Sequence, residues 1–130
     1  LKENEVLTAI EVPRLNSNQL AEYAKMAHPA SFYAVVGASV VITVENDRCT
    51  AASIAVGGMV ANPVRASSVE SALVGQQLNA ESVRAAADLV ANDLSGSLMG
   101  DFYASANYRK AMAAVETRHA LMHAIGLAHH

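Results

Sequence analysis

The sequence is poor in the residues that mark several large classes of protein. Its 130 residues include one cysteine, three prolines and no tryptophan, and charged residues make up only 16% against 52% apolar residues. The single cysteine, Cys49, cannot form an internal disulfide. Because no signal-peptide pattern is present either, we expect a reducing, cytoplasmic location. The excess of apolar over charged residues favours a compact fold over disorder.

Charge and hydropathy exclude two kinds of partner. The net charge of −3 leaves no basic surface for a phosphate backbone, so nucleic acid is not expected. No apolar run reaches the roughly 20 residues of a membrane span, and the longest, residues 34–44, suits a buried strand. The length fits a single domain over residues 1–130. Since the chain begins with Leu1 rather than Met, we expect a piece of a longer protein.

The first half of the chain has the patterns of β-strands. Residues 5–12 alternate in polarity and are predicted to form a strand that Pro13 ends. Residues 33–44 are rich in Val and Ile and predict a second strand. The polar residues 45–48 then form a turn, and residues 49–56 return as a partner strand.

The second half has the signals of helices. Ser67 and Glu70 have the spacing of a capping box, and Gly75 ends the short helix that follows them. Asn79 is predicted to cap a second helix. One face of that helix carries apolar side chains: Val83, Ala87, Val90 and Leu94.

Residues 101–121 predict a long last helix, with Asp101 and Ser105 as candidates for its N-terminal cap. Apolar side chains recur on it at helical spacing and predict its buried stripe: Tyr108, Met112, Val115, Met122 and Ile125. Strands followed by helices predict an α+β fold, with a mostly antiparallel sheet of three or four strands and three helices packed on one face.

The residue identities in this last helix are more informative than its periodicity. It resembles the last helix of the flavin subunits of molybdenum hydroxylases, such as the medium subunit of carbon monoxide dehydrogenase and the flavin part of xanthine dehydrogenase. The matching residues are Asp101, Ser105, Tyr108, Arg109, Met112, Arg118, Ala120 and Leu121. Further blocks at residues 5–13, 23–31 and 57–75 also resemble the family in order and spacing.

The resemblance implies the C-terminal domain of an FAD-binding subunit. In such subunits a Gly-rich loop of an upstream FAD-binding domain holds the flavin phosphates, and this chain has no such loop. We therefore expect the chain to fold alone without holding FAD firmly, and not to be an enzyme by itself. The family's subunit passes electrons from iron–sulfur clusters through FAD to an acceptor. The implied partners are the upstream domain, an iron–sulfur small subunit and a molybdopterin large subunit.

Two residues are implied by the resemblance as cofactor-binding, and no residue is implied as catalytic. Leu7 matches a position that packs near the flavin, although an apolar residue on a polar strand face is also common in ordinary surfaces and interfaces. Lys25 matches a position that contacts FAD, where an ammonium can act as a point charge. The competing interpretation is a solvated surface lysine.

Residues 20–27 give conflicting signals. Their composition favours a helix. The resemblance implies a strand instead, and because pairing in a sheet often overrides propensity, we predict a strand.

Several other residues allow either a structural or a functional interpretation. Tyr108 and Arg109 are expected to be structural, as a core or interface aromatic and a salt-bridge partner. Arg65 is expected in an exposed loop, facing a subunit or solvent. A nucleophile pair of Ser31 and His28 is not expected, because no supporting motif accompanies it.

Two other functions remain open. A stand-alone interaction module would keep this fold without redox work. A metal-binding domain would use His119 and His123, which have chelating i, i+4 spacing, together with His129 and His130. No acidic third ligand is expected on that helix face, and the last two histidines are either native or the remnant of a purification tag, so no metal site is predicted.

Overall fold

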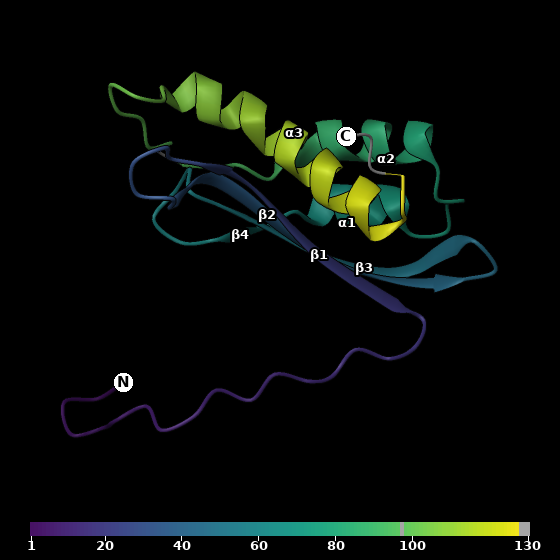
Figure 1. The fold of residues 1–130 in the computed structure, drawn as a ribbon, viewed down its shortest axis with the longest axis horizontal. Helices are drawn as coiled ribbons and strands as arrows, with labels where there is room; N and C mark the ends of the chain where they lie inside the picture. The colour runs from purple at the N-terminus through teal and green to yellow at the C-terminus, as the bar shows by residue number, and fades with distance from the viewer. Residues whose placement is uncertain (97, 128–130) are drawn as a thin grey trace.

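The computed structural model describes residues 1–96 and 98–127. The protein folds as an antiparallel sheet that helices cover on one face (Figure 1). The sheet has the strand order β1-β2-β3-β4. Its strands are β1 (Gln19–Ala27), β2 (Ala34–Glu45), β3 (Arg48–Gly57) and β4 (Val64–Arg65), and the helices are α1 (Ser67–Leu73), α2 (Ala80–Ala87), the 3₁₀ turn η1 (Asp88–Asn92) and α3 (Ala106–Ala124). The predicted α+β architecture is confirmed. In the part of the chain described, no helix is long and apolar enough to cross a bilayer.

The core lies between the sheet and the helices. Alternate residues of β2 point toward the helices and are fully buried, namely Val36, Ala38, Val40 and Ile42. Ile54 and Val56 of β3 complete this layer, and Leu73 and Leu121 meet it from α1 and α3. The two-residue periodicity of the sequence here therefore reports one buried and one open face of the sheet.

The β2–β3 hairpin has its turn within the polar residues 45–48, as the sequence predicted. Asn46 and Asp47 connect the strands with φ angles of 50° and 59°, the left-handed conformation that a two-residue hairpin loop requires. Short polar side chains tolerate this conformation better than other non-glycine residues.

The strand predicted over residues 20–27 is confirmed as β1. It pairs with β2 in antiparallel register from Gln19, opposite Thr43, to Ala27, opposite Ala34. Helix α3 packs across β1 and β2, so a strand here gains backbone hydrogen bonds and apolar contacts together. These gains outweigh the helical preference of its Ala, Glu, Lys and Met residues.

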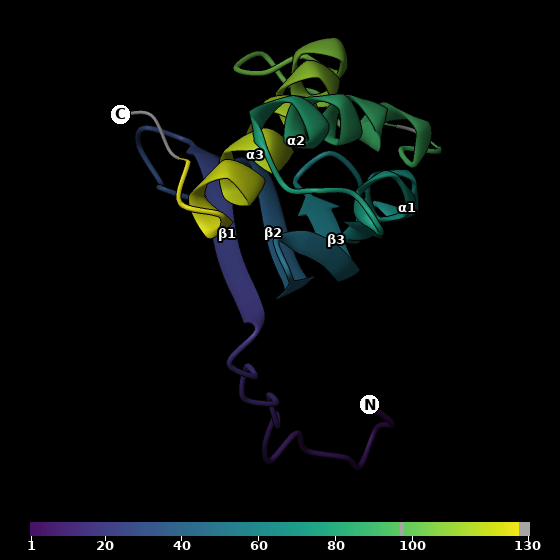
Figure 2. The ribbon, with the colours of Figure 1, turned by 90° about the vertical axis from the view of Figure 1, so that its right-hand side faces the viewer.

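The strand predicted over residues 5–12 is wrong. This segment runs extended without strand pairing, apart from the rest of the molecule (Figures 1 and 2), and all of its residues are exposed. Alternation favours a strand only where a partner edge satisfies the backbone, and no described segment pairs with it. Val6, Ile10 and Val12 are therefore left as exposed apolar side chains.

The predicted capping box of α1 is also wrong, whereas the cap of α2 is confirmed. The N-cap residue of α1 is Ala66, which has no capping side chain, and the Asp93 carboxylate accepts from the Ser68 N–H at 3.0 and 3.2 Å instead. Glu70 instead accepts a hydrogen bond of 2.7 Å from the Ile54 backbone N–H. The Asn79 side chain accepts from Glu81 N–H and Ser82 N–H, both at 2.9 Å.

Helix α3 begins later than predicted and is most deeply buried on a different face. Ser105 is its cap, while Asp101 accepts from Tyr103 N–H and Ala104 N–H in the preceding turn. The predicted apolar stripe is confirmed in part: Met112, Met122 and Ile125 are partly buried and pack against the core, whereas Tyr108 is exposed. The buried residues are Ala113, Glu116, Thr117, Ala120 and Leu121. Mostly small side chains of α3 face the sheet. The periodicity of large apolar residues does not identify such a face.

Candidate functional site

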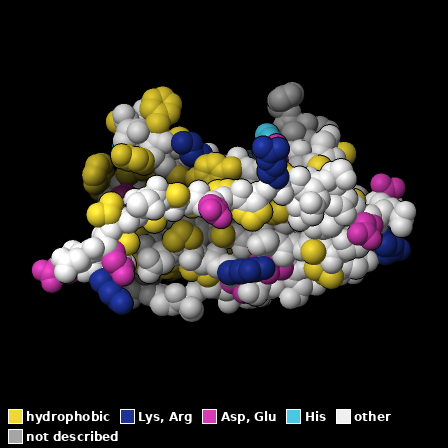
Figure 3. All heavy atoms as spheres, turned by 90° about the horizontal axis from the view of Figure 1, so that it is seen from below, with side chains coloured by type: hydrophobic (Ala, Val, Ile, Leu, Met, Phe, Trp, Pro, Cys, Tyr) yellow, Lys and Arg dark blue, Asp and Glu magenta, His cyan; other side chains and the backbone are white. Residues whose placement is uncertain are grey.

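The sheet face that the helices leave open is lined by small side chains. The register places three rungs on this face: Lys25–Gly37–Gly57, Tyr23–Ser39–Ala55 and Ala21–Val41–Ser53. Figure 3 views the molecule from this side, with the extended N-terminal segment on the same side of the sheet, and charged side chains are scattered over it. Such a face suits contact with a flat or apolar surface more than with a charged one.

A hollow of about 330 Å³ lies at one end of this open face. It is lined by Tyr23, Ala34, Gly37, Ser39, Ala55, Val56, Gly57, Gly58 and Pro63. The Tyr23 ring lies over Gly37, where any Cβ would collide with the Tyr23 hydroxyl. A Cβ at Gly57 would instead meet only Pro63, at 3.9 Å, so the absence of this side chain keeps the hollow open.

Lys25 stands on the rung that borders the hollow, opposite Gly37. Its Nζ donates a hydrogen bond of 2.9 Å to the Phe32 carbonyl. An ammonium group has three donors, so two remain for a ligand or water. The predicted site residue therefore lies at an exposed position beside a concave surface, and its hydrogen bond to Phe32 holds the β1–β2 loop.

Two exposed aromatic residues in this loop were missed by the sequence reasoning. Phe32 is 71% exposed with a φ of 59°, and Tyr33 beside it is 80% exposed. Their signal in the sequence was an aromatic pair between a polar loop and a strand. The loop is held by His28 N–H to the Tyr33 carbonyl and Phe32 N–H to the His28 carbonyl, both at 2.8 Å. The aromatic pair is thus presented outward on a structured loop.

The exposed aromatic character continues onto the loop before α3. The rings of His28 and Tyr103 lie 4.5 Å apart, which joins the two loops. Phe102 and Met99 are also exposed there. In Figure 3 hydrophobic side chains gather at this end of the molecule, on the left. Exposed apolar clusters of this kind mark contact surfaces.

Arg109 fixes the framework behind this end. Its Nη1 donates to the Val35 and Gly58 carbonyls at 2.8 Å each, and its Nη2 lies 2.7 Å from Asp101 Oδ2. The expected salt-bridge role is confirmed. Hydrogen bonds from the Ala104 and Tyr103 amides, together with the Arg109 guanidinium, lower the pKa of Asp101 below its ordinary 3.8.

The structure does not bring Leu7 to Lys25. Leu7 lies in the extended N-terminal segment, 60% exposed, and makes no hydrogen-bonded or core contact with the sheet. Of the two residues that the resemblance implied, only Lys25 stands on the open face.

The other candidates are arranged as follows. Arg65 Nε donates to Glu70 Oε1 at 2.7 Å, so its partner is within the chain. Ser31 and His28 hydrogen-bond to neighbouring backbone amides and not to one another. Burial raises the pKa of the Cys49 thiol, which makes it a poor nucleophile.

The histidine pair on α3 gains an acidic neighbour that was not expected. His119 Nδ1 lies 3.6 Å from Oε2 of the buried Glu116. Over the described residues, no group of three or more His, Cys, Asp and Glu side chains is placed to hold a metal. His129 and His130 lie outside the described residues.

The open face offers a surface suited to a flat, partly polar ring system. The hollow offers glycine backbone and small side chains, the rim offers a cation, and the neighbouring loop offers exposed aromatic rings. These groups match a flat, partly polar ring system.

Several solved structures of oxidoreductases share this fold. Carbon monoxide dehydrogenase from Hydrogenophaga pseudoflava matches with a TM-score of 0.79 and 26% identity, over 91% of this chain and 40% of that chain. The enzyme from Oligotropha carboxidovorans matches with a TM-score of 0.77 and 27% identity, over 94% and 45%. Quinoline 2-oxidoreductase from Pseudomonas putida 86 matches with a TM-score of 0.75 and 25% identity, over 85% and 39%. The chain thus spans less than half the length of these relatives.

The amino-acid sequence also matches a known domain family. The CO dehydrogenase flavoprotein C-terminal domain matches residues 21–124, which leaves the extended N-terminal segment outside the match. No curated protein sequence matches the chain. The chain belongs to the CO dehydrogenase flavoprotein C-terminal domain family, part of the flavoprotein subunits of molybdenum hydroxylases.

Proposed function

We propose that this chain is the C-terminal domain of the FAD-binding subunit of a molybdenum hydroxylase, and that its open sheet face completes the flavin site. The observation that carries the proposal is the glycine-lined hollow with Lys25 at its border. FAD, when bound, supplies the capacity to accept and pass on electrons. The chain's own residues orient the ring, place a charge beside it and exclude water.

Each candidate residue has a distinct role in this proposal. Lys25 donates hydrogen bonds and positive charge toward the ring's polar edge. Tyr33 and Phe32 present aromatic rings against a flat neighbour. Leu7 packs near the flavin by family resemblance, once residues 5–12 are held by the upstream FAD-binding domain. Their exposed, unpaired backbone is available for such pairing.

The partners follow from the same proposal. The upstream domain holds the phosphates, an iron–sulfur subunit delivers electrons and a molybdopterin subunit oxidises the substrate, all in the cytoplasm. Carbon monoxide dehydrogenases are among the matched structures, and one of them lacks the Mo-pyranopterin moiety of its molybdenum cofactor. The domain by itself carries out no complete reaction in this account.

One observation favours a second candidate, a stand-alone interaction module. The aromatic end formed by the β1–β2 loop and the loop before α3 is a large exposed apolar surface, and such a surface serves any protein partner. The coding sequence upstream of Leu1 distinguishes the two functions. A Gly-rich FAD-binding domain there supports the first, and a start codon close to Leu1 supports the second.

Filling the hollow tests the proposal in the complete flavin subunit. Gly57→Leu adds a side chain where the nearest described neighbour, Pro63, is 3.9 Å away, so the fold should tolerate it. We expect less FAD retained per subunit because the side chain occupies the hollow. The control is Ala51→Leu, at an exposed position on the same face of the same strand but outside the hollow.

The comparison separates a flavin contact from a general effect on the sheet. The proposal predicts that Gly57→Leu lowers FAD content while Ala51→Leu leaves it unchanged, with similar thermal midpoints for both. Equal FAD content in the two variants, at full occupancy, contradicts it.

A further inference from the structure

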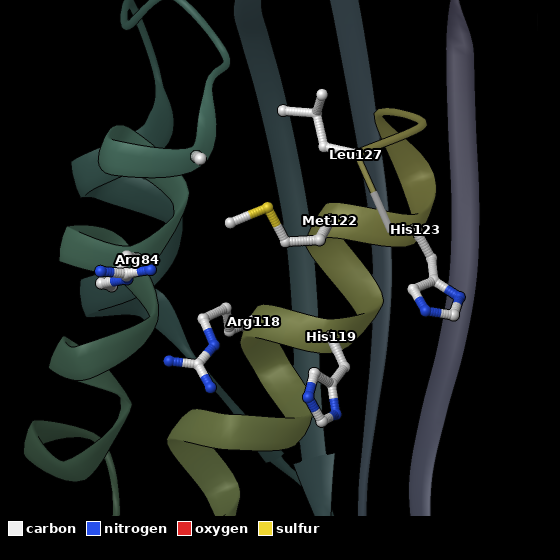
Figure 4. Close-up of a pocket in the computed structure, with 7 residues that line it drawn as sticks. Arg84, Arg118, His119, Met122, His123 and Leu127 are labelled. Carbon is white, nitrogen blue, oxygen red and sulfur yellow. The ribbon is translucent and has the colours of Figure 1, made fainter. Parts of the chain in front are cut away.

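A second hollow, of about 360 Å³, lies on the helical side of the molecule. It is lined by Ala80, Arg84, Arg118, His119, Met122, His123 and Leu127. Figure 4 shows Arg84 on α2 and Arg118 on α3 on opposite sides of the gap between these helices, with the Arg118 guanidinium directed toward α2. Since the helices cover the opposite face of the sheet, this hollow is separate from the proposed flavin site.

Two arginines, Arg84 and Arg118, line this hollow. Within the described residues, neither Arg84 nor Arg118 forms an ion pair. Arg109 and Arg65, in contrast, are each paired with a carboxylate at 2.7 Å. Because both guanidinium groups line one hollow, both can donate hydrogen bonds to an anion bound there. This concentration of positive charge stands out in a chain whose net charge is −3.

The remaining lining restricts the kind of anion. Met122 points toward α2 in Figure 4, and with Leu127 and Ala80 it provides an apolar wall beside the charged groups. A guanidinium group matches a phosphate through paired hydrogen bonds. The two cations line a single hollow of about 360 Å³ between two helices and do not form a stripe along one helix, so a compact ligand fits better than an extended acidic peptide.

We propose that the hollow between α2 and α3 binds a small phosphate monoester, with the phosphate between Arg84 and Arg118 and the organic part against Met122 and Leu127. His119 and His123 border the site on the outer side of α3. The proposal is independent of the flavin site, so its failure leaves the proposed function in place.

The test is a titration of the 130-residue chain with phenyl phosphate, followed by backbone amide NMR shifts. Phenol and inorganic phosphate test the separate parts of the ligand, and a hexaglutamate peptide tests an acidic segment as the occupant. The variants are Arg84→Gln and Arg118→Gln. Lys110→Gln is the control, because Lys110 is an exposed cation on α3 that does not line the hollow.

We expect saturable shifts confined to α2 and the C-terminal half of α3, with phenyl phosphate binding more tightly than phosphate or phenol. Each arginine variant should weaken binding by about tenfold, because a charge-assisted hydrogen bond is lost, while Lys110→Gln binds as the unchanged chain does. Equal binding by all variants, or tighter binding of hexaglutamate than of phenyl phosphate, overturns the proposal. Unchanged amide spectra away from the hollow show that the variants remain folded.

Discussion

Arg109 and Gly58 are joined by a hydrogen bond of 2.8 Å from Nη1 to the Gly58 carbonyl, and the same nitrogen donates to the Val35 carbonyl at the same distance. One guanidinium on α3 therefore binds the start of β2 and the residue after β3. These two strand ends border the hollow on the opposite face of the sheet. The position of the last helix and the shape of the proposed flavin surface are thus coupled through one side chain.

Arg109→Met should destabilise the domain by about 2–4 kcal/mol, because it leaves several carbonyls of a mostly buried region without a donor. The Arg109 side chain is only 11% exposed. Chemical denaturation of the 130-residue chain measures the free energy of unfolding. The matched variant is Arg84→Met, at an exposed position without an ion pair among the described residues, which should change stability by less than about 0.5 kcal/mol. A similar loss in both variants would show that Arg109 is not special.

Gly58→Ala should cost more than about 2 kcal/mol. Gly58 has a φ of +89°, and a Cβ there would collide with the Val35 carbonyl. Gly126→Ala separates these two effects, since its φ of +72° is also left-handed but no atom of the described residues lies within 4 Å of the added Cβ. We expect about 1 kcal/mol for Gly126→Ala. Thermal unfolding of both proteins checks the difference, and equal midpoints would rule out the steric part of the argument.

The two predicted helix caps make a matched pair. Asn79→Ala removes a side chain that accepts two backbone hydrogen bonds, and a loss of about 1 kcal/mol is expected. Ser67→Ala should cost less than about 0.5 kcal/mol, because Ser67 is not the N-cap residue of α1 and its side chain does not cap the helix. Urea denaturation of both variants gives the comparison. A larger loss of unfolding free energy for Ser67→Ala than for Asn79→Ala would indicate that Ser67 caps α1 after all.

Asp101 should make stability depend on pH in the acid range. Its pKa in the folded protein is lowered below 3.8, first by the hydrogen bond from the Ala104 amide. The ionised form is therefore favoured by folding, and its contribution is present above pH 3.8 and is lost as the pH falls through the folded pKa. Asp101→Asn should be less stable than the unchanged protein at pH 7, and the difference should shrink below pH 3.8. A difference that stays constant with pH would contradict the assignment.

Sequence reasoning found the elements whose local and tertiary signals agree. The run that became β2 and the polar turn at Asn46 and Asp47 followed directly from periodicity and turn chemistry. The strand β1 was identified only through family resemblance, because the composition of Gln19–Ala27 favours a helix. The strand predicted over residues 5–12 was wrong for a different reason. Their polarity alternates as in a strand, but no described segment pairs with them.

The site was less predictable than the fold, because it depends on what the register brings together. Lys25 was identified by resemblance, but no sequence pattern shows that Gly37 and Gly57 share its rung. The role of Arg109 at Val35 and Gly58 depends on contacts 51 and 74 residues apart in the chain. The exposed aromatic residues Phe32 and Tyr33 were visible in the sequence, although their exposure was not.

The proposed flavin contact is tested most directly by Lys25→Met in the complete subunit. The change keeps the aliphatic stem and removes the charge. It also removes one exposed hydrogen bond to the Phe32 carbonyl, so the loss of folding stability should stay below about 1 kcal/mol. Lys110→Met, which removes an exposed lysine of α3, is the control.

The measurement is the flavin reduction potential and the FAD retained per subunit in these two variants. A positive charge beside the ring favours the reduced cofactor, so Lys25→Met should lower the potential by roughly 30 mV, about 1.4 kcal/mol for a two-electron couple, and weaken FAD retention. Lys110→Met should change neither quantity. An unchanged potential and full FAD retention in Lys25→Met would mean that Lys25 is a surface lysine that holds its own loop, and that the open face of the sheet does not meet the flavin there.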